Sequence, residues 1–306
     1  MKTATIPIDA FTETEHRVNL KQGSREHIRA YFEDSGPDYK AWSKNYNMHF
    51  GYCTAATHLF NRERMLEQMN LEVANRLKIS ENEPWKIADM GCGMGATAAS
   101  IGTKFPNAEI NGITIVPWQV QMGNALIKNR KLKNTRLHLS DISDPIIPNE
   151  SVDGAYALES FCYGDKLDKA NFINGMSKVL KPGGRFVIVD GFIKRPKVSF
   201  GPIFNYLYKA VCKNWALNDF AEIGAFKEAL TRHNLEIEEI EDASWRIAPS
   251  ALQVPYVTLR FIWDKFRDGD HLNQLRWGHL KACVCGMLMG MFRGHFSYYI
   301  ISGKRK

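Results

Sequence analysis

Residues 86–96 read Lys-Ile-Ala-Asp-Met-Gly-Cys-Gly-Met-Gly-Ala, and this stretch decides the fold. A short apolar run precedes three glycines at 91, 93 and 95, and the helix-compatible run ATAASIGTKF follows them. Glycine lets the backbone turn tightly and approach a ligand closely, while a helix N-terminus offers unpaired N–H groups. Residues 89–95, here called the glycine loop, therefore predict a strand, a loop and a helix that together hold an anionic or polar ligand.

The chain on either side of the glycine loop alternates short β-like runs with amphipathic segments of helical length. The β-like runs lie at 86–91, 109–116, 135–141, 152–160 and 184–192. This alternation predicts βαβ units, with ligands at the carboxyl ends of the strands. We expect an α/β fold with a Rossmann-like, doubly wound sheet of about seven strands. The final run, 295–306, is expected to return as a strand at an edge of this sheet.

Three regions follow from the change of pattern along the chain. Residues 1–80 are predicted to form a helical cap that helps to enclose cofactor and substrate, and residues 81–192 the cofactor-binding core. Residues 193–306 are predicted to insert a helical substrate lid and then complete the sheet. The longest apolar stretch, 282–292, is about half of the roughly 20 residues that a membrane helix needs. We expect it to be a buried helix or part of the lid.

Composition places the chain among ordinary globular enzymes. Its 306 residues are 44% hydrophobic and 24% charged, and the polar start at 1–16 has no apolar segment typical of a targeting signal. The six cysteines form no CxxC pair and no zinc spacing. The net charge of +7 would permit an anionic partner but does not identify one. We therefore expect a cytoplasmic protein with a small-molecule substrate, no nucleic-acid partner and no stable membrane insertion; a homo-oligomer stays open.

The glycine loop alone fits two classes of enzyme, because Ala96 also completes the dinucleotide pattern GxGxxG/A. A nicotinamide enzyme would carry an acid at the end of the second strand. Here that strand ends in Gly112-Ile-Thr-Ile-Val-Pro-Trp-Gln119, and an acid, Asp141, follows the third strand instead. The fourth strand, VDGAYALES, and the turn LKPGG complete the order. This ordered set resembles the class I S-adenosylmethionine-dependent methyltransferases.

Three segments resemble one subgroup, which includes the sterol, tocopherol, sarcosine and cyclopropane-fatty-acid methyltransferases. They are NGITIVPWQVQMGNAL at 111–126, the aromatic run AWSKNYNMHFGYC at 41–53, and YALESFCY at 156–163. A histidine that the family carries near Tyr163 is missing here. The resemblance implies S-adenosylmethionine as cofactor and a small, often lipophilic acceptor.

The resemblance also implies a set of cofactor contacts. Asp89 would meet the ammonium group, Thr114, Ile115 and Gln119 the ribose, and Asp141 the adenine amine. The whole set of expected cofactor-binding residues is Tyr31, Ser43, Asp89, Gly91, Cys92, Gly93, Thr114, Ile115, Gln119, Asp141 and Ile142.

Glu159 is the expected catalytic residue. A carboxylate at the end of a buried strand costs free energy unless it has a partner or a chemical task. Alkylation of a carbon–carbon double bond leaves a carbocation, which needs aromatic faces and a base. Glu159 and Tyr163, with substrate contacts from Tyr46, Phe50, Tyr52 and Phe161, could supply both. Glu159 could instead bind the cofactor or cap the next helix.

His49 is a competing base, since imidazole titrates near neutrality. A histidine among aromatic residues is, however, more often packed and hydrogen-bonded, and the aromatic run itself can belong to the core.

The acceptor is the open part of the prediction. Arg246 and Arg260, together with Arg293 and Lys197, could grip a diphosphate, and Mg²⁺ would be needed only in that case; no metal site is certain. We expect C-methylation of an isoprenoid alkene, either a prenyl diphosphate or a sterol-like molecule. The alternatives are N- or O-methylation of a small amine, phenol or quinol, and a scaffold that binds cofactor without catalysis. The intact glycine loop, Asp141 and Glu159 argue against the scaffold.

Overall fold

The computed structural model describes residues 20–57 and 59–306, and within them the chain forms one mixed sheet of eight strands. The strand order is β3-β2-β1-β4-β5-β8-β7, and the short β6 pairs with β5 off this path. The strands are β1 Lys86–Met90, β2 Glu109–Thr114, β3 Thr135–Leu139, β4 Val152–Leu158, β5 Leu180–Ile193, β6 Ala221–Glu222, β7 Leu235–Asp242 and β8 Phe296–Arg305. The predicted α/β, Rossmann-like sheet is confirmed. The start of the chain, whose composition was interpreted above, lies outside the described residues.

The first five strands are parallel, and β8 is antiparallel to both of its neighbours. The prediction that residues 295–306 form an edge strand is wrong, because β8 lies between β5 and β7. Ile300 and Ile301 are fully buried there, with Ile300 opposite Val189 of β5. A strand that is apolar on both faces is typical of the inside of a sheet.

Helices cover both faces of the sheet. The helices are α1 Arg25–Ser35, α2 Tyr39–Trp42, α3 Arg62–Leu77, α4 Ala96–Lys104, α5 Pro117–Asn129, α6 Ala170–Val179, α7 Pro202–Asn214, α8 Ile223–Arg232, α9 Ser244–Ala251, α10 Val254–Arg267 and α11 Gln274–Gly290, with short 3-10 turns η2 Gly36–Asp38, η3 Phe161–Tyr163 and η4 Lys197–Ser199. Side chains of β5 alternate between two core clusters, as the period of a strand requires. Phe186 and Ile188 pack with α6 and α8, while Val187 and Val189 pack with α3 and α4.

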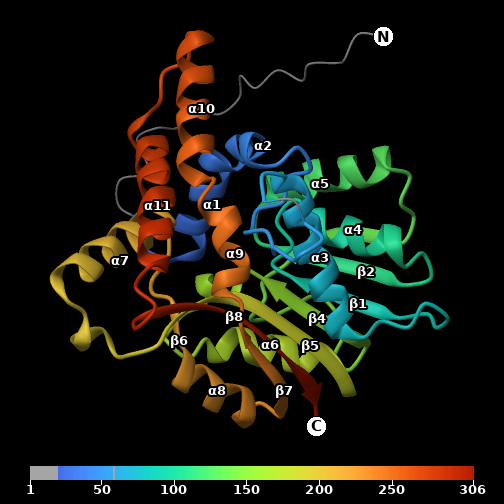
Figure 1. Cartoon of the computed structure of the whole chain (residues 1–306). Helices are drawn as coiled ribbons and strands as arrows, with labels where there is room; N and C mark the ends of the chain where they lie inside the picture. Colours follow the sequence, from blue (N-terminus) through green and yellow to red (C-terminus); the bar gives the residue numbers. More distant parts are fainter. Residues whose placement is uncertain (1–19, 58) are drawn as a thin grey trace.

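The remaining helices gather beyond the carboxyl ends of the parallel strands. Figure 1 shows α1, α2, α10 and α11 together at that end of the molecule, with α10 projecting furthest. A third apolar cluster joins α7 to α11 through Leu207, Val211, Cys285 and Met289. Most of the apolar stretch 282–292 thus lies in α11, where Ala282, Cys285 and Met289 are buried. None of the helices in residues 20–57 and 59–306 is long and apolar enough to cross a membrane.

Candidate active site

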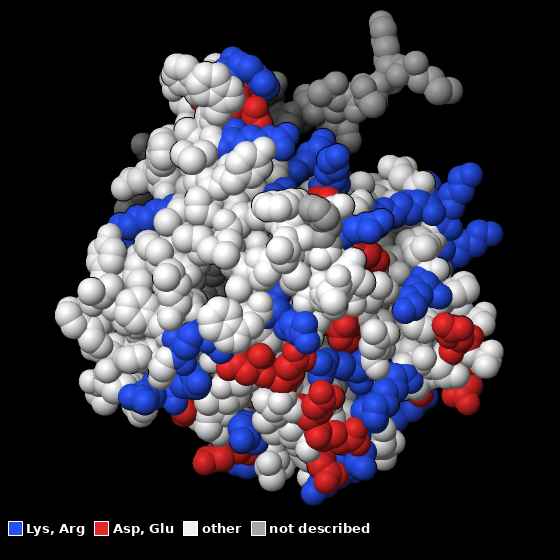
Figure 2. Space-filling view, in the orientation of Figure 1, with Lys and Arg blue, Asp and Glu red and all other residues white. Residues whose placement is uncertain are grey.

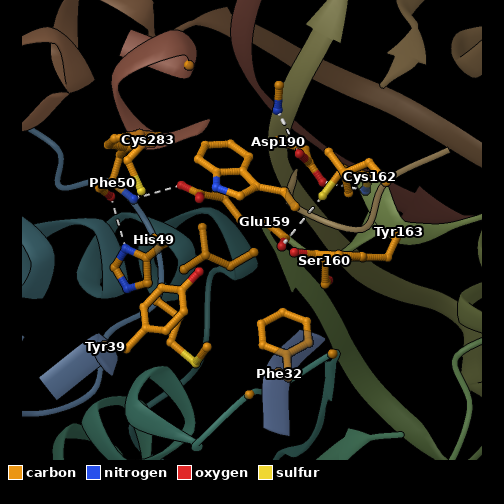
Figure 3. A pocket seen from close by; sticks show the side chains of 18 of the residues that line it. Phe32, Tyr39, His49, Phe50, Glu159, Ser160, Cys162, Tyr163, Asp190 and Cys283 are labelled. Carbon is orange, nitrogen blue, oxygen red and sulfur yellow. Dashed lines mark hydrogen bonds between the residues drawn. The ribbon is translucent and has the colours of Figure 1, made fainter. Parts of the chain in front are cut away.

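A large cavity of about 790 Å³ lies where β1, β2, β4 and β5 end. Its floor is the glycine loop and the residues that follow β2 and β3. Its upper wall comes from α1, α2, α9, α10 and α11. Figure 3 shows one part of it, where Glu159 and Asp190 lie together with Phe32, Tyr39 and Phe50. The volume is typical of a site for a small molecule.

The three glycines of the glycine loop have different tasks. All have positive φ, +94° at Gly91, +51° at Gly93 and +73° at Gly95. A Cβ on Gly91 would lie 2.3 Å from the Cβ of Ser160, and one on Gly95 would lie 2.9 Å from Leu137. Protein neighbours therefore require glycine at 91 and 95. Gly93 lines the cavity, where its nearest neighbour would be the Met48 sulfur at 3.1 Å.

The backbone N–H groups of this region are also divided, because some bond to the protein and others are left for a ligand. The N–H groups of Gly91 and Cys92 donate to the carbonyl of Ile113, at 3.0 and 2.9 Å. They hold β1 against β2. No side chain caps α4, which begins at Ala96 after Gly95. Its first-turn N–H groups are thus the donors left for an anionic ligand.

Asp89 lies at the end of β1 and is buried beside the cavity. Its Oδ2 accepts a hydrogen bond of 2.7 Å from the Tyr156 hydroxyl, and burial raises its pKa to about 7. A cationic ligand group would restore the charged carboxylate. This fits the ammonium contact expected for Asp89.

Thr114 and Gln119 form a polar pair after β2. The Thr114 hydroxyl donates to Gln119 Oε1 at 2.7 Å, which fixes the amide. Gln119 Nε2 is buried and has no hydrogen-bond partner in the described part of the chain. An unpaired buried donor costs about 1–3 kcal/mol. A ligand oxygen at this point would satisfy it, as the expected ribose contact requires. The neighbouring Ile115 carbonyl accepts from Arg29 Nε at 2.8 Å, a partner that the motif does not contain.

Asp141 and Ile142 line the cavity after β3. The Asp141 carboxylate pairs with Arg25 Nε at 2.5 Å and accepts from the backbone and hydroxyl of Ser143, both at 2.7 Å. Arg25 comes from α1, so the first helix of the cap reaches the place expected for the adenine.

Tyr31 and Ser43, expected to close over the cofactor, do not line the cavity. The Tyr31 hydroxyl lies 2.7 Å from His279 Nδ1 of α11, and the Ser43 hydroxyl donates to Glu63 of α3 at 3.0 Å. Both side chains are used in joining helices to one another. Tyr39 and Trp42, on the neighbouring helix α2, line the cavity instead.

Glu159 directly follows β4, in a left-handed conformation with φ +51°. Its Oε1 accepts hydrogen bonds from the Phe50 backbone N–H at 2.7 Å and from the Tyr298 hydroxyl at 2.6 Å. Burial raises its pKa to about 8, although both hydrogen bonds act to lower it. Glu159 lines the cavity, and no side chain caps the turn that follows it. Glu159 is therefore held by its hydrogen bonds to Phe50 and Tyr298 and does not cap the following turn.

His49 also lines the cavity, but both of its ring nitrogens are engaged. Nδ1 lies 2.9 Å from the Phe50 carbonyl, and Nε2 lies 3.1 Å from Asn70 Oδ1. Burial lowers its pKa to about 4. The ring therefore has the packed, hydrogen-bonded environment of a structural histidine and is a weak base.

The expected substrate contacts divide into two groups. Tyr46, Phe50 and Tyr163 line the cavity. Tyr52 and Phe161 do not, because they pack in the two core clusters on either face of the sheet. The Tyr52 hydroxyl donates to Glu241, and Phe161 packs against Phe172 and Phe226.

The two arginines expected to grip a diphosphate are also outside the cavity. Arg246 stacks over the Tyr52 ring with its guanidinium 5.6 Å from the ring centre. Arg260 is exposed on α10, near Asp264. Both expectations are wrong, since these side chains lie on helix faces turned away from the cavity lining.

Several cavity residues were not among the expected site residues: Phe32, Tyr39, Trp42, Asp190, Trp215, Phe220, His279, Cys283 and Tyr298. Most come from elements far apart in the chain, and their local sequence carries no signal. Asp190 is an exception, since it interrupts the buried strand run FVIVD. Its carboxylate accepts from the backbone of Cys162 at 2.9 Å and of Gly191 at 2.8 Å, and burial raises its pKa to about 6.

The sheet order, the glycine loop after β1, the polar pair after β2 and the acid after β3 together define a class I S-adenosylmethionine-dependent methyltransferase. Residues 87–184 match the family described as "Methyltransferase domain". The chain therefore carries a methyltransferase domain, and it resembles sterol, tocopherol and cyclopropane-forming methyltransferases.

Three proteins illustrate this resemblance. The chain is 27% identical over 276 residues to a probable chloroplastic tocopherol O-methyltransferase of Oryza sativa subsp. japonica. The alignment covers 83% of this chain and 74% of that protein. It is 27% identical to the sterol 4-C-methyltransferase strm-1 of Caenorhabditis elegans, over 59% of this chain and 53% of that protein, so it spans about half of the nematode protein. The cyclopropane synthase MmaA2 of Mycobacterium tuberculosis has the same fold, with a TM-score of 0.74 and 13% identity over 94% of this chain and 100% of that one.

Proposed function

We propose that this methyltransferase adds a methyl group to an alkene carbon of an uncharged, lipophilic acceptor such as a sterol-like isoprenoid, with Glu159 as the base. The observation that carries the proposal is Glu159 itself. A carboxyl group with a pKa of about 8 stands at the end of β4 and lines a cavity rich in aromatic side chains. Raised acids in clefts are candidates for proton transfer.

The residues on the cofactor side fit S-adenosylmethionine. The unpaired Gln119 amide, the uncapped first turn of α4 and the buried Asp89 offer a donor, an anion site and a cation partner within one cavity. These residues would hold the ribose, carboxylate and ammonium groups, with Asp141 at the adenine. When bound, the cofactor supplies an electrophilic methyl group.

The acceptor side of the cavity would then stabilise a positive charge on the acceptor and remove a proton from it. After an alkene carbon is alkylated, the neighbouring carbon of the acceptor is cationic, and aromatic faces such as those of Trp42, Tyr46 and Phe50 stabilise it. Glu159 would take the proton that restores a double bond. The Phe50 N–H and the Tyr298 hydroxyl both hold Oε1, so Oε2 would accept the proton.

The charges of the cavity favour an uncharged acceptor over a prenyl diphosphate. Among the described residues that line it, the arginines are Arg25 and Arg293, and each is paired with an aspartate. Several acids line the same space: Asp38, Asp89, Asp141, Glu159, Asp165 and Asp190. A diphosphate would meet this excess of carboxyl groups and would need Mg²⁺ to neutralise it. Activity that survives a chelator would support the uncharged acceptor.

Methylation of a phenol or quinol oxygen is the second candidate. The name of the rice relative, a tocopherol O-methyltransferase, favours it. Glu159 would serve there too, as the base that removes the phenolic proton. Cytoplasmic location, methylation of an amine and self-association stay predictions.

The deciding experiment incubates the enzyme with methyl-labelled S-adenosylmethionine and a panel of sterols, prenyl diphosphates, quinols and amines. We expect label on carbon of an uncharged alkene; label on oxygen or nitrogen would reject this proposal. Glu159→Gln should keep cofactor affinity and lose at least about 100-fold in turnover. Glu228→Gln, on the exposed side of α8, is the matched control and should turn over normally.

A further inference from the structure

The outer face of α10 carries a continuous apolar stripe. Tyr256, Leu259, Trp263 and Phe266 have side chains that are 65%, 67%, 65% and 77% exposed. Their spacing of three, four and three residues places them on one side of the helix. These four residues are called the α10 stripe. Large apolar side chains grouped on a surface mark an interaction site more often than scattered ones do.

The inner face of the same helix already has its packing partners. Val254, Val257 and Phe261 are buried and line the cavity. Helix α10 is therefore apolar on two opposite sides, and packing among residues 20–57 and 59–306 accounts for only one of them. The α10 stripe contributes nothing to the lining of the cavity. It needs a separate explanation.

Cationic side chains accompany the stripe. Arg260 and Arg267 lie on one flank of α10 and are 66% and 62% exposed. A shallow groove beside Tyr256 is lined by Lys40, Lys44 and Arg260. Figure 1 shows α10 projecting from the molecule, and in Figure 2 this projection is largely white with blue and red groups beside it. Acidic partners such as Asp264 are present, but the lysines come from α2 and the segment after it.

We propose that the α10 stripe docks on the surface of a lipid bilayer that carries anionic headgroups. Leucine, phenylalanine, tryptophan and tyrosine beside arginine and lysine are the composition of a helix that lies in a membrane interface. The four apolar side chains would enter the headgroup boundary, and the Arg260 and Lys40 side chains would meet lipid phosphates. The helix lies on the membrane and does not cross it.

A lipid surface fits this patch better than a second copy of the chain. The stripe extends for about 15 Å, the length of ten helical residues. A stable dimer needs about 800 Å² on each partner, more than one short helix face offers. The cavity lies on the other side of the same helix, so an acceptor dissolved in the bilayer would have a short path to it. This last point rests on the proposed lipophilic acceptor; the docking itself does not.

The test uses full-length protein and sedimentation with vesicles. Vesicles of phosphatidylcholine are compared with vesicles of equal parts phosphatidylcholine and phosphatidylglycerol. We expect binding to the anionic vesicles that is about tenfold weaker or more in the triple variant Leu259→Ser, Trp263→Ser, Phe266→Ser. The matched control, Val198→Ser with Ile203→Ser, removes exposed apolar side chains outside α10 and should bind as the wild type does.

Three results would overturn the proposal. The first is no binding of the wild type to either vesicle, and the second is equal binding of wild type and triple variant. The third is a dimer in solution that the triple variant dissociates, which would assign the stripe to a second copy of the chain. Unchanged melting temperature and cofactor affinity of the variant exclude a failure to fold. Turnover of a detergent-dispersed acceptor should be normal in the triple variant, so loss of docking and failure of the proposed function are separate outcomes.

Discussion

At the scale of single residues, the site is built on acids that burial keeps partly protonated. Asp89, Glu159 and Asp190 all have raised pKa values, and in each case burial is the main cause. Each acid also accepts hydrogen bonds that favour its charged form, so each is held near the point at which it changes charge. Such groups respond strongly to a charged ligand.

Glu159 should make the stability of the free protein depend on pH. Its pKa is 4.5 in the unfolded chain and about 8 in the folded one, so the folded state favours the neutral acid. The neutral acid stabilises the folded protein fully below about pH 4.5. This stabilisation is lost as the pH rises through about 8. Between pH 4.5 and about 8, the free energy of unfolding should therefore fall less in Glu159→Gln than in the wild type. Thermal unfolding at a series of pH values measures it, and parallel curves for the two proteins would contradict it.

Asp89 should couple cofactor binding to proton release. The free carboxyl has a pKa of about 7, and an ammonium group beside it would favour the carboxylate. Affinity for S-adenosylmethionine should rise as the pH rises through about 7 and then level off. Asp89→Asn should abolish this rise and weaken binding by about tenfold or more. Calorimetry in buffers of different ionisation enthalpy measures the protons.

Tyr156→Phe is the matched test of the same coupling. The Tyr156 hydroxyl donates to the Asp89 carboxylate and so lowers its pKa. Its loss should move the pH dependence of cofactor binding upward. Proton uptake on binding, in either protein, would refute the assignment of Asp89 to the ammonium group.

The sequence predicted Asp89 and Glu159 because each stands at the end of a strand in a motif of fixed order, and it missed Asp190, which lies within β5. It could not predict their partners. Tyr298, which holds Glu159, lies 139 positions further along the chain, and the hydrogen bond to it exists only after the sheet has formed. Tyr52 and Phe161 were misassigned for the related reason that neighbours in the chain face opposite sides of a strand or turn.

At the scale of elements, the glycine loop combines two requirements that the motif does not separate. Gly91 and Gly95 make room for Ser160 and Leu137, while Gly93 faces the cavity. The motif therefore combines packing at Gly91 and Gly95 with access to the cavity at Gly91 and Gly93. The C-terminal strand shows the opposite case. Its place between β5 and β7 follows from pairing across the whole sheet, and the adjacent Ile300 and Ile301, buried on opposite faces, are a local sign of it.

The variants Gly91→Ala and Gly93→Ala should separate the packing requirement from the requirement for ligand access. Gly91→Ala puts a Cβ 2.3 Å from Ser160 at φ +94°, so unfolding free energy should fall by about 2–4 kcal/mol. Gly93→Ala meets only the flexible Met48 side chain and should cost about 1 kcal/mol for its left-handed backbone. Its main effect should be weaker cofactor binding. Urea denaturation and calorimetry test both, and equal destabilisation by the two variants would contradict the division.

At the scale of the whole molecule, the cavity is closed by segments from both ends of the described chain. Tyr31 of α1 meets His279 of α11, 248 positions away, and Asp38 meets Arg276 at 3.1 Å. The predicted regions 1–80 and 193–306 thus contact each other above the core. Composition and pattern indicated a cap and a lid, but their mutual contacts depend on a fold that brings the two together.

The pair Asp38 and Arg276 should join the cap to the lid energetically. Both side chains are largely buried, and burial raises the Asp38 pKa, so an unpaired carboxylate there is unfavourable. A double-mutant cycle with Asp38→Asn and Arg276→Gln should give a coupling of about 1–2 kcal/mol in urea denaturation. The exposed pair Asp264 and Arg267 on α10 is the control and should give about 0.5 kcal/mol or less. A coupling as small as the control would show that the two regions close independently.

The place of β8 has a consequence for how the protein is made. The strand at residues 296–305 pairs with both β5 and β7, so the sheet has a gap beside β5 until these residues have been synthesised. Residues 296–305 are translated well after β5, and contacts of such long sequence separation form slowly. The nascent chain must wait with the apolar edge of β5 uncovered, which exposes it to aggregation. We expect its yield in cells to depend on chaperones that bind nascent chains.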